Sequence, residues 1–187
     1  MEASYQTPKG MNAVAEQSRS QSWRRSVANS TTSTKPFSFD TIADFDQHID
    51  QSIPDYSQLA QAIVRVSQWF TKPNTAVYDL GCSTGKLLEQ IKHDGWKVGI
   101  DRSTNLLPKS HDLTDYIAED LRHFNFRHKA SLVLSIFTLQ FIPPTDRLEI
   151  LTRIHGSMVE GGAFIWAEKV RSETGYWEQI QTFAHYD

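Results

Sequence analysis

Cysteine is nearly absent from this chain of 187 residues, because Cys82 is the only one. A lone cysteine cannot form an internal disulfide, so the sequence favours the reducing environment of the cytoplasm. No apolar run is long enough to cross a membrane, and the first residues contain no hydrophobic signal core. We therefore expect neither a membrane anchor nor a secretory signal.

The sequence has no excess of positive charge, since its formal net charge is −3 at pH 7. This balance argues against a surface that coats nucleic acid in general. The seven histidines are scattered and show no metal-ligand spacing such as H-E-x-x-H. No constellation of general acid and base stands out either. We therefore predict no metal site and assign no catalytic residue.

The length and the hydrophobic content of 39% suit one domain with a sizeable core. Residues 1–35 are rich in Ser, Thr, Gln and Asn and contain few large apolar side chains. Such a segment buries too little surface to offset the entropy of ordering it. We predict a disordered tail over residues 1–35 and a folded domain over residues 36–187.

The most informative stretch is an apolar run, Ala76 to Leu80, that contains Asp79 and leads into a loop with Gly81 and Gly85. Apolar residues at helical spacing follow this loop. A strand, a glycine loop and a helix form a nucleotide-sized site at the strand's C-terminal end. A second apolar run ends in Asp101, whose separation from Asp79 fits the roughly 20-residue spacing of an acid that binds ribose hydroxyls.

Other glycine loops fit this stretch less well. A P-loop has four residues between its glycines and a Ser or Thr after the lysine, whereas here Leu87 follows Lys86. A dinucleotide-binding loop has the pattern G-x-G-x-x-G, and the close glycine pair is missing. The remaining pattern is D-x-G-x-x-x-G. A tight strand-to-helix turn without a ligand is the alternative.

The rest of the chain alternates between strand-like and helical patterns. Two helices precede the first strand and are expected to pack over the sheet's edge or its ligand crevice. After Asp101 only a short helix is possible before Pro108. Later segments predict a third strand over residues 116–120, a fourth over 132–137 and a fifth over 163–167. Between the fourth and the fifth strand we expect a helix over residues 143–160, which Gly161-Gly162 end. Its apolar side is expected to consist of Leu148, Leu151, Ile154 and Met158. This alternation predicts an α/β fold with a doubly wound, mostly parallel, Rossmann-like sheet.

The D-x-G-x-x-x-G pattern resembles motif I of the class I S-adenosylmethionine-dependent methyltransferases. Much of residues 37–185 is similar to one branch of these enzymes, the carboxy-S-adenosylmethionine synthase family of bacterial tRNA uridine modification. Several stretches carry this resemblance. They are Phe39-Asp40 through Ser52-Ile53-Pro54-Asp55-Tyr56-Ser57, Tyr78-Asp79-Leu80-Gly81-Cys82-Ser83, Phe137-Thr138-Leu139-Gln140-Phe141, Gly161-Gly162-Ala163 and Glu168-Lys169.

The resemblance implies S-adenosyl-L-methionine as the cofactor and a set of contacts to it. Tyr56 would touch the methionine end, and Asp101 would accept from the ribose hydroxyls with Arg102 beside it. Asp120 would accept from the adenine amino group, and Leu121 would pack on the ring. The expected cofactor-binding residues are completed by the loop and by two strand-end positions: Asp79, Gly81, Cys82, Ser83, Gly85 and Ile136.

The chain departs from the family pattern in two places. Ile136 stands where the family has asparagine, and the chain ends at Asp187, before the family's arginine that holds the new carboxylate. The last strands of a complete methyltransferase sheet are missing too, so we expect a C-terminally shortened relative. A second copy or another partner could complete the sheet, because an apolar edge strand invites association.

Three functions follow from the sequence. The first is methyl transfer to an unidentified acceptor, either tRNA or a small molecule. The second, implied by the resemblance, is conversion of the cofactor into its carboxylated form with prephenate, which the two departures would make inefficient. The third is a non-catalytic protein that holds S-adenosylmethionine or a partner.

Overall fold

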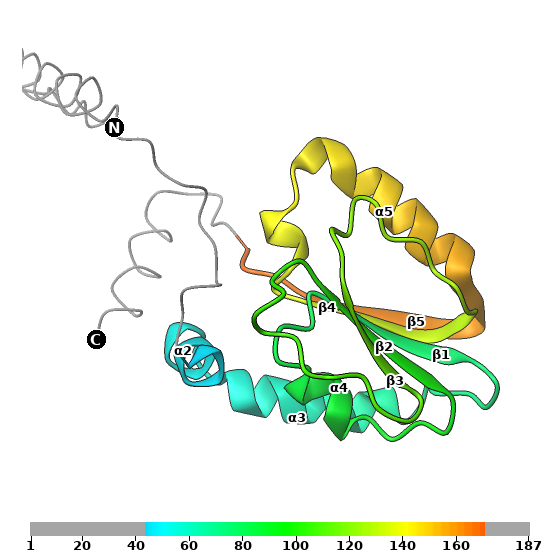
Figure 1. Ribbon diagram of the computed structural model, residues 1–187, viewed down its shortest axis with the longest axis horizontal. Coiled ribbons are helices and arrows are strands. Elements are labelled where there is room, and N and C mark those ends of the chain that lie inside the picture. Colours follow the sequence, from blue (N-terminus) through cyan, green and yellow to red (C-terminus); the bar gives the residue numbers. More distant parts are fainter. Residues whose placement is uncertain (1–43, 171–187) are drawn as a thin grey trace, which may run out of the picture. The chain divides into compact units, whose positions relative to one another are not determined.

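The computed structural model describes residues 44–170, which belong to the second of two units, residues 38–187. The predicted tail, residues 1–35, and the last residues before Asp187 lie outside this part. The described chain forms five parallel strands in the order β3-β2-β1-β4-β5 (Figure 1). The strands are β1 (Ala76–Leu80), β2 (Trp96–Asp101), β3 (Thr114–Ala118), β4 (Ala130–Ile136) and β5 (Met158–Ala167). This order confirms the predicted doubly wound sheet.

Helices cover both faces of the sheet, which explains why the central strands are apolar along their whole length. All residues of β1 are buried, and so are the first six of β4. One face packs Tyr78 and Ile100 against Ile154 of α5 (Pro144–Ser157). The other packs Leu132 against α3 (Tyr56–Ser67) and α4 (Lys86–Gln90). Figure 1 shows α5 on one side of the sheet and α3 with α4 on the other.

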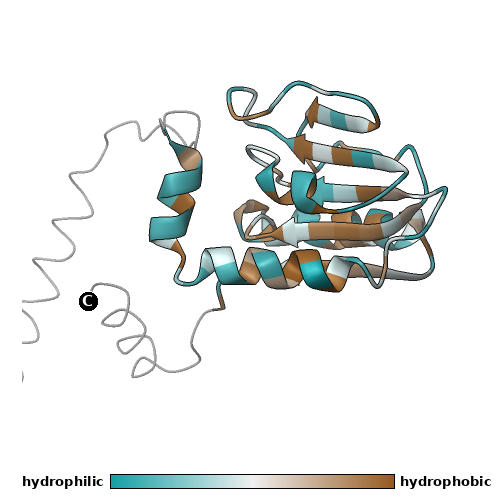
Figure 2. Ribbon diagram, turned by 90° about the horizontal axis from the view of Figure 1, so that it is seen from below, coloured by the Kyte–Doolittle hydropathy of each residue, from teal (hydrophilic) through white to brown (hydrophobic). Residues whose placement is uncertain are grey.

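The helix α2 (Phe45–Ser52) precedes α3 and has no buried residue. Asp44 caps it by accepting a hydrogen bond of 3.0 Å from the backbone N–H of Gln47. Between the two helices Asp55 has a left-handed φ of 57°, which turns the chain. Most of the α2 ribbon is hydrophilic, whereas α3 carries brown hydrophobic bands (Figure 2). The prediction of two helices before the first strand is confirmed.

The passage from α5 to β5 differs from the prediction. We expected Gly161-Gly162 to close the helix, but α5 ends at Ser157 and Met158 already pairs with Ala130 of β4. The pairing shifts after that point, because Leu132 lies opposite Ala163. Both glycines therefore lie in an irregular part of β5, where Gly161 has φ +65°.

The buried face of α5 also differs. We expected Leu148, Leu151, Ile154 and Met158 to form its apolar side, but Leu148 is 74% exposed and Leu151 39%. The buried residues are Ile150, Ile154 and Ser157. Both stripes have helical spacing and share Ile154, so periodicity alone did not distinguish them.

The connection between β2 and β3 contains no helix. The sequence allowed at most a short helix before Pro108, and the structure forms turns at residues 104–106. The predicted stop at Pro108 is consistent with this outcome, because proline disfavours helical continuation. A 3₁₀ turn, η2 (Leu139–Phe141), lies between β4 and α5.

Candidate functional site

A cavity of about 510 Å³ opens at the C-terminal ends of the strands, on the side where the strand order reverses. This volume lies within the range of small-molecule sites. Its walls come from α2, α3, the glycine loop and the segments that follow β2, β3 and β4. Ten of the eleven predicted site residues line it: Tyr56, Asp79, Gly81, Cys82, Ser83, Asp101, Arg102, Asp120, Leu121 and Ile136.

Gly85 is the eleventh, and it does not line the cavity. It has φ +72°, and a Cβ atom there would lie 2.5 Å from the ring of Tyr116. Its N–H donates to the carbonyl of Cys82 at 2.8 Å, which closes the loop before α4 begins. The structure therefore gives Gly85 a role in the turn and in the packing of Tyr116.

Gly81 lies at the other end of the loop, directly after β1. Its φ is +81°, and the side chain of Thr138 fills the space of the missing Cβ. The N–H groups of Gly81 and Cys82 both donate to the carbonyl of Ile100, at 2.7 and 3.0 Å. The loop backbone is thus tied to the end of β2 and comes close to the turn after β4.

Asp101 at the end of β2 organises two backbone segments. One carboxylate oxygen accepts from the N–H of Ser83 at 3.0 Å, and the other accepts from the N–H of Ser103 at 2.8 Å. These bonds fix the direction of the carboxylate toward the cavity that Asp101 lines. Each oxygen has two lone-pair sites, so the group retains capacity to accept from a ligand hydroxyl.

Asp79 is only 3% exposed, yet it lines the cavity. Within residues 44–170 its carboxylate makes no hydrogen bond, while its backbone belongs to the sheet. Burial, and then the charge of Asp101, raise the pKa of Asp79 to about 7. An acid without a partner at this depth is stabilised in its charged form when a cation approaches it.

Tyr56 begins α3 and faces the same space. Burial, and then the charge of Asp79, raise its pKa to about 12, so the phenol keeps its proton and can donate. Its ring lies 6.4 Å from that of Phe137, centroid to centroid. Phe137 has a left-handed φ of +55° after β4, and strain of this kind concentrates at functional sites. Phe137 begins the stretch of residues 137–141 that carried part of the family resemblance, but we did not assign Phe137 or Thr138 to the site.

Asp46 of α2 also belongs to the site, although no sequence pattern assigned it there. This carboxylate accepts from the hydroxyl of Thr84 at 2.8 Å and lies 3.7 Å from the ammonium of Lys86. Both partners belong to the segment around the glycine loop. Phe45, Ile49 and Ile53 of the same region also line the cavity. The helix α2 thus covers the cavity, and Asp46 attaches it to Thr84 and Lys86 beside the glycine loop.

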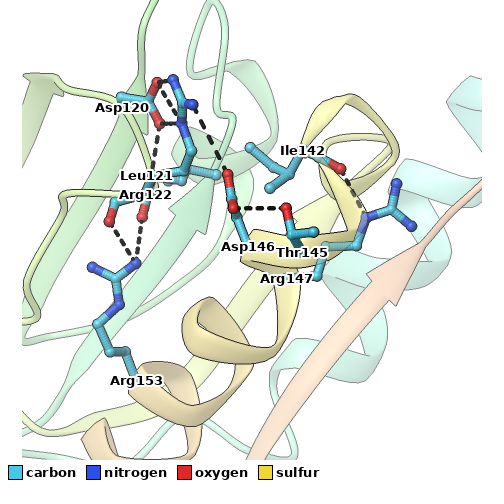
Figure 3. Close-up of polar contacts among 8 residues, drawn as sticks. All are labelled: Asp120, Leu121, Arg122, Ile142, Thr145, Asp146, Arg147 and Arg153. Carbon is cyan, nitrogen blue, oxygen red and sulfur yellow. Dashed lines mark hydrogen bonds and ion pairs between the residues drawn. The ribbon is translucent and has the colours of Figure 1, made fainter.

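Asp120, after β3, is paired with Arg122. Figure 3 shows the guanidinium lying against both carboxylate oxygens, with contacts of 2.6 to 3.1 Å. This pairing lowers the pKa of Asp120 to about 2. We expected Asp120 to accept from a ligand, and in this structure Arg122 already donates to the same carboxylate.

Acidic side chains outnumber basic ones around the cavity. Among the described residues, the acids are Asp46, Asp50, Asp79, Asp101, Glu119 and Asp120, and the bases are Lys86, Arg102 and Arg122. Such a site favours a ligand with a positive centre and hydroxyl donors. No cluster of metal-ligand type occurs in residues 44–170, and no helix within that range is long and apolar enough to cross a membrane.

Comparisons with known proteins agree with this geometry. A family model described as a methyltransferase domain matches residues 77–162. DesVI of Streptomyces venezuelae has a TM-score of 0.53 and 22% identity over 70% of this chain and 58% of its own. Phosphoethanolamine N-methyltransferase 1 of Haemonchus contortus, solved with phosphoethanolamine and S-adenosylhomocysteine, has a TM-score of 0.54 and 14% identity over 87% of this chain and 34% of its own. The fold is that of the S-adenosylmethionine-dependent methyltransferases, whose cofactor is S-adenosyl-L-methionine.

Two curated relatives narrow the class further. The carboxy-S-adenosyl-L-methionine synthase of Staphylococcus epidermidis is 33% identical over 156 residues, which cover 79% of this chain and 68% of the relative. That of Ectopseudomonas mendocina is 34% identical over 172 residues, which cover 80% of this chain and 67% of the relative. The chain belongs to the carboxy-S-adenosyl-L-methionine synthase family.

Proposed function

We propose that this chain binds S-adenosyl-L-methionine in the cavity and transfers its methyl group to an acceptor. The observation that carries the proposal is the joint position of Asp79 and Asp101 at neighbouring strand ends, one acid without a partner and one fixed by two N–H groups. The fixed carboxylate suits ribose hydroxyls, and the buried one suits the nearby positive charge of a sulfonium.

The other lining residues fit the two ends of the same ligand. Gly81, Cys82 and Ser83 would face the methionine part with their backbone, and Tyr56 would donate its phenol hydrogen there. Leu121 would pack against the adenine ring. Arg102, exposed beside Asp101, and Ile136, at the end of β4, would border the ligand. We infer all of these roles from the positions of the residues around the cavity.

The chemistry needs little from acids and bases. A sulfonium supplies an already activated methyl group. The chain's contribution is then to exclude water and to align acceptor, methyl and sulfur. Ile136, Phe137 and the apolar side chains of α2 provide the dry wall for this alignment.

Carboxy-S-adenosylmethionine synthesis is the second candidate, because the family's named members have that activity. It requires a cation for the added carboxylate. Among the described cavity residues, Lys86 and Arg122 already pair with Asp46 and Asp120. Arg102 is then the remaining cation among them, and it neighbours Asp101, which is proposed to hold the ribose and not the sulfonium. We therefore expect methyl transfer to be the better-supported reaction.

The test is a turnover assay with the full chain. S-adenosylmethionine is incubated with and without prephenate, and mass spectrometry looks for S-adenosylhomocysteine and for the carboxylated cofactor. The proposal predicts little carboxylated product, and S-adenosylhomocysteine once small-molecule or tRNA acceptors are added. Efficient prephenate-dependent carboxylation would overturn methyl transfer in favour of the family reaction. Binding of S-adenosylmethionine without either product would leave a non-catalytic binding protein.

The acceptor and the assembly belong to the same proposal. We propose either a tRNA or a small molecule as the acceptor. β5 lies at the edge of the described sheet, and its Trp166 is 60% exposed. Pairing of this edge with a second copy or another partner stays a prediction, as does a cytoplasmic location.

A further inference from the structure

Both carboxylate oxygens of Asp120 already accept hydrogen bonds from Arg122 in this structure. One oxygen accepts from the backbone N–H of Arg122 at 2.9 Å and from its Nε at 3.0 Å. The other accepts from Nε at 3.1 Å and from a terminal guanidinium nitrogen at 2.6 Å. A carboxylate has about four lone-pair sites. A ligand N–H that approaches Asp120 therefore competes with the guanidinium for these lone pairs, and a full bond to the ligand is favoured when the guanidinium moves.

The backbone around this pair is held in place, so the movement falls to a side chain. Arg153 of α5 donates to the carbonyls of Leu121, Arg122 and Phe124 at 2.8 to 3.0 Å. Figure 3 shows this guanidinium below the segment, separate from the Asp120 pair. The side chain of Arg122 itself is 44% exposed and has room to turn.

A second acid lies ready for the displaced guanidinium. Asp146, in the first turn of α5, is 3.9 Å from the other terminal nitrogen of Arg122. Its second oxygen accepts from the hydroxyl of Thr145 at 3.0 Å, which orients the carboxylate. Arg122 thus lies between two acids and can leave Asp120 without losing a charged partner (Figure 3).

We propose that Arg122 is a specificity-determining positioning residue that occupies Asp120 in the empty site and turns toward Asp146 when an adenine amino group arrives. This inference rests on the proposed binding of S-adenosylmethionine. Only a ligand with an N–H donor at that position replaces the bond that Asp120 gives up. A purine without the amino group leaves Arg122 on Asp120 and gains nothing.

The test compares two ligands, S-adenosylmethionine and its analogue with purine in place of adenine, on the full chain by titration calorimetry. In Arg122→Ala, no guanidinium occupies the carboxylate of Asp120 before the ligand binds. Affinity for S-adenosylmethionine should rise about three- to tenfold, the worth of one hydrogen bond, with little change for the analogue. With Asp146→Asn, Arg122 loses its second partner, and the preference for adenine over purine should shrink. Arg122→Lys, which keeps the charge without the two-pronged contact, should fall between wild type and Arg122→Ala.

The control variant is Arg102→Ala, which removes one positive charge from the cavity wall without touching Asp120. It should change the affinities for both ligands by the same factor. If Arg122→Ala also changes both equally, or weakens S-adenosylmethionine, the inference is wrong and Arg122 acts through general charge or direct contact. If wild type binds neither ligand, the proposed function fails and this inference fails with it. If Asp101→Asn weakens both ligands while the Arg122 variants leave their ratio unchanged, only this inference falls.

Discussion

The side chain of Thr138 occupies the space in which a Cβ atom at Gly81 would lie. This relationship joins the loop after β1 to the turn after β4, so the two central strands present one continuous wall to the cavity. The glycine is required twice, for its φ of +81° and for the absence of a side chain.

Gly81→Ala should therefore damage both stability and binding. Overpacking costs about 1–3 kcal/mol, and a left-handed φ adds about 1–2 kcal/mol for a residue with a Cβ. Thermal unfolding and titration with S-adenosylmethionine measure the two effects. Gly156→Ala in α5 is the control, because no atom lies within 4 Å of its added Cβ. It should be neutral or stabilise by up to about 1 kcal/mol. Equal behaviour of the two variants would contradict the contact with Thr138.

The corrected face of α5 gives a second pair of variants. Ile150 is 3% exposed and Leu148 is 74% exposed. Ile150→Ala should cost about 2–5 kcal/mol of unfolding free energy, because it leaves a cavity in the core. Leu148→Ala should stay within about 0.5 kcal/mol of wild type. Denaturant unfolding measures both, and a larger loss at Leu148 would mean that this face is covered in solution.

The buried acid Asp79 predicts a pH dependence of binding. Its pKa is about 7 in the unliganded chain. A positive ligand favours the ionised carboxylate, so binding lowers this pKa and releases a proton below pH 7. Affinity for S-adenosylmethionine should rise as the pH rises through about 7 and then level off. Burial keeps the pKa of neighbouring Tyr56 and Cys82 above this window, so neither group accounts for the change.

Titration calorimetry in two buffers of different ionisation enthalpy counts the released protons. Asp79→Asn should bind more weakly above pH 7 and lose most of the pH dependence. A flat affinity profile in the wild type, or an unchanged profile in Asp79→Asn, would show that another group governs the charge of the site.

The attachment of α2 predicts an effect on rates. Asp46 is the acid that joins this helix to Thr84 and Lys86. Asp46→Ala should loosen the cover, so stopped-flow association and dissociation of S-adenosylmethionine should both become faster, with a smaller change in affinity. Asp50→Ala is the comparison, since it removes the same charge but its carboxylate joins α2 to Ser57 of α3 and not to the glycine loop. The same acceleration in both variants would show that the contact with Thr84 and Lys86 has no special role.

The order of the elements and the acids at the strand ends were predictable, because each follows from a local pattern. Asp79, Gly81 and Asp101 belong to such patterns. Asp46 does not, since it meets Thr84 across 38 residues of chain. The pairing of Asp120 with Arg122 could not be predicted for another reason. The sequence pattern locates the acid at the strand end, but it does not determine the direction of the neighbouring guanidinium. The face of α5 was ambiguous because two apolar stripes share Ile154.

Whether the cavity binds S-adenosylmethionine is decided by titrating the full chain above pH 7 and comparing wild type with Asp101→Asn. Asp115→Asn, an acid of β3 that does not line the cavity, is the matched control. We expect one cofactor bound per wild-type chain and a loss of about 1.5–3 kcal/mol in Asp101→Asn, the range for a hydrogen bond to a charged group. The control should match wild type. No binding by wild type, or the same dissociation constant in Asp101→Asn, would contradict the assignment of this cavity to S-adenosylmethionine.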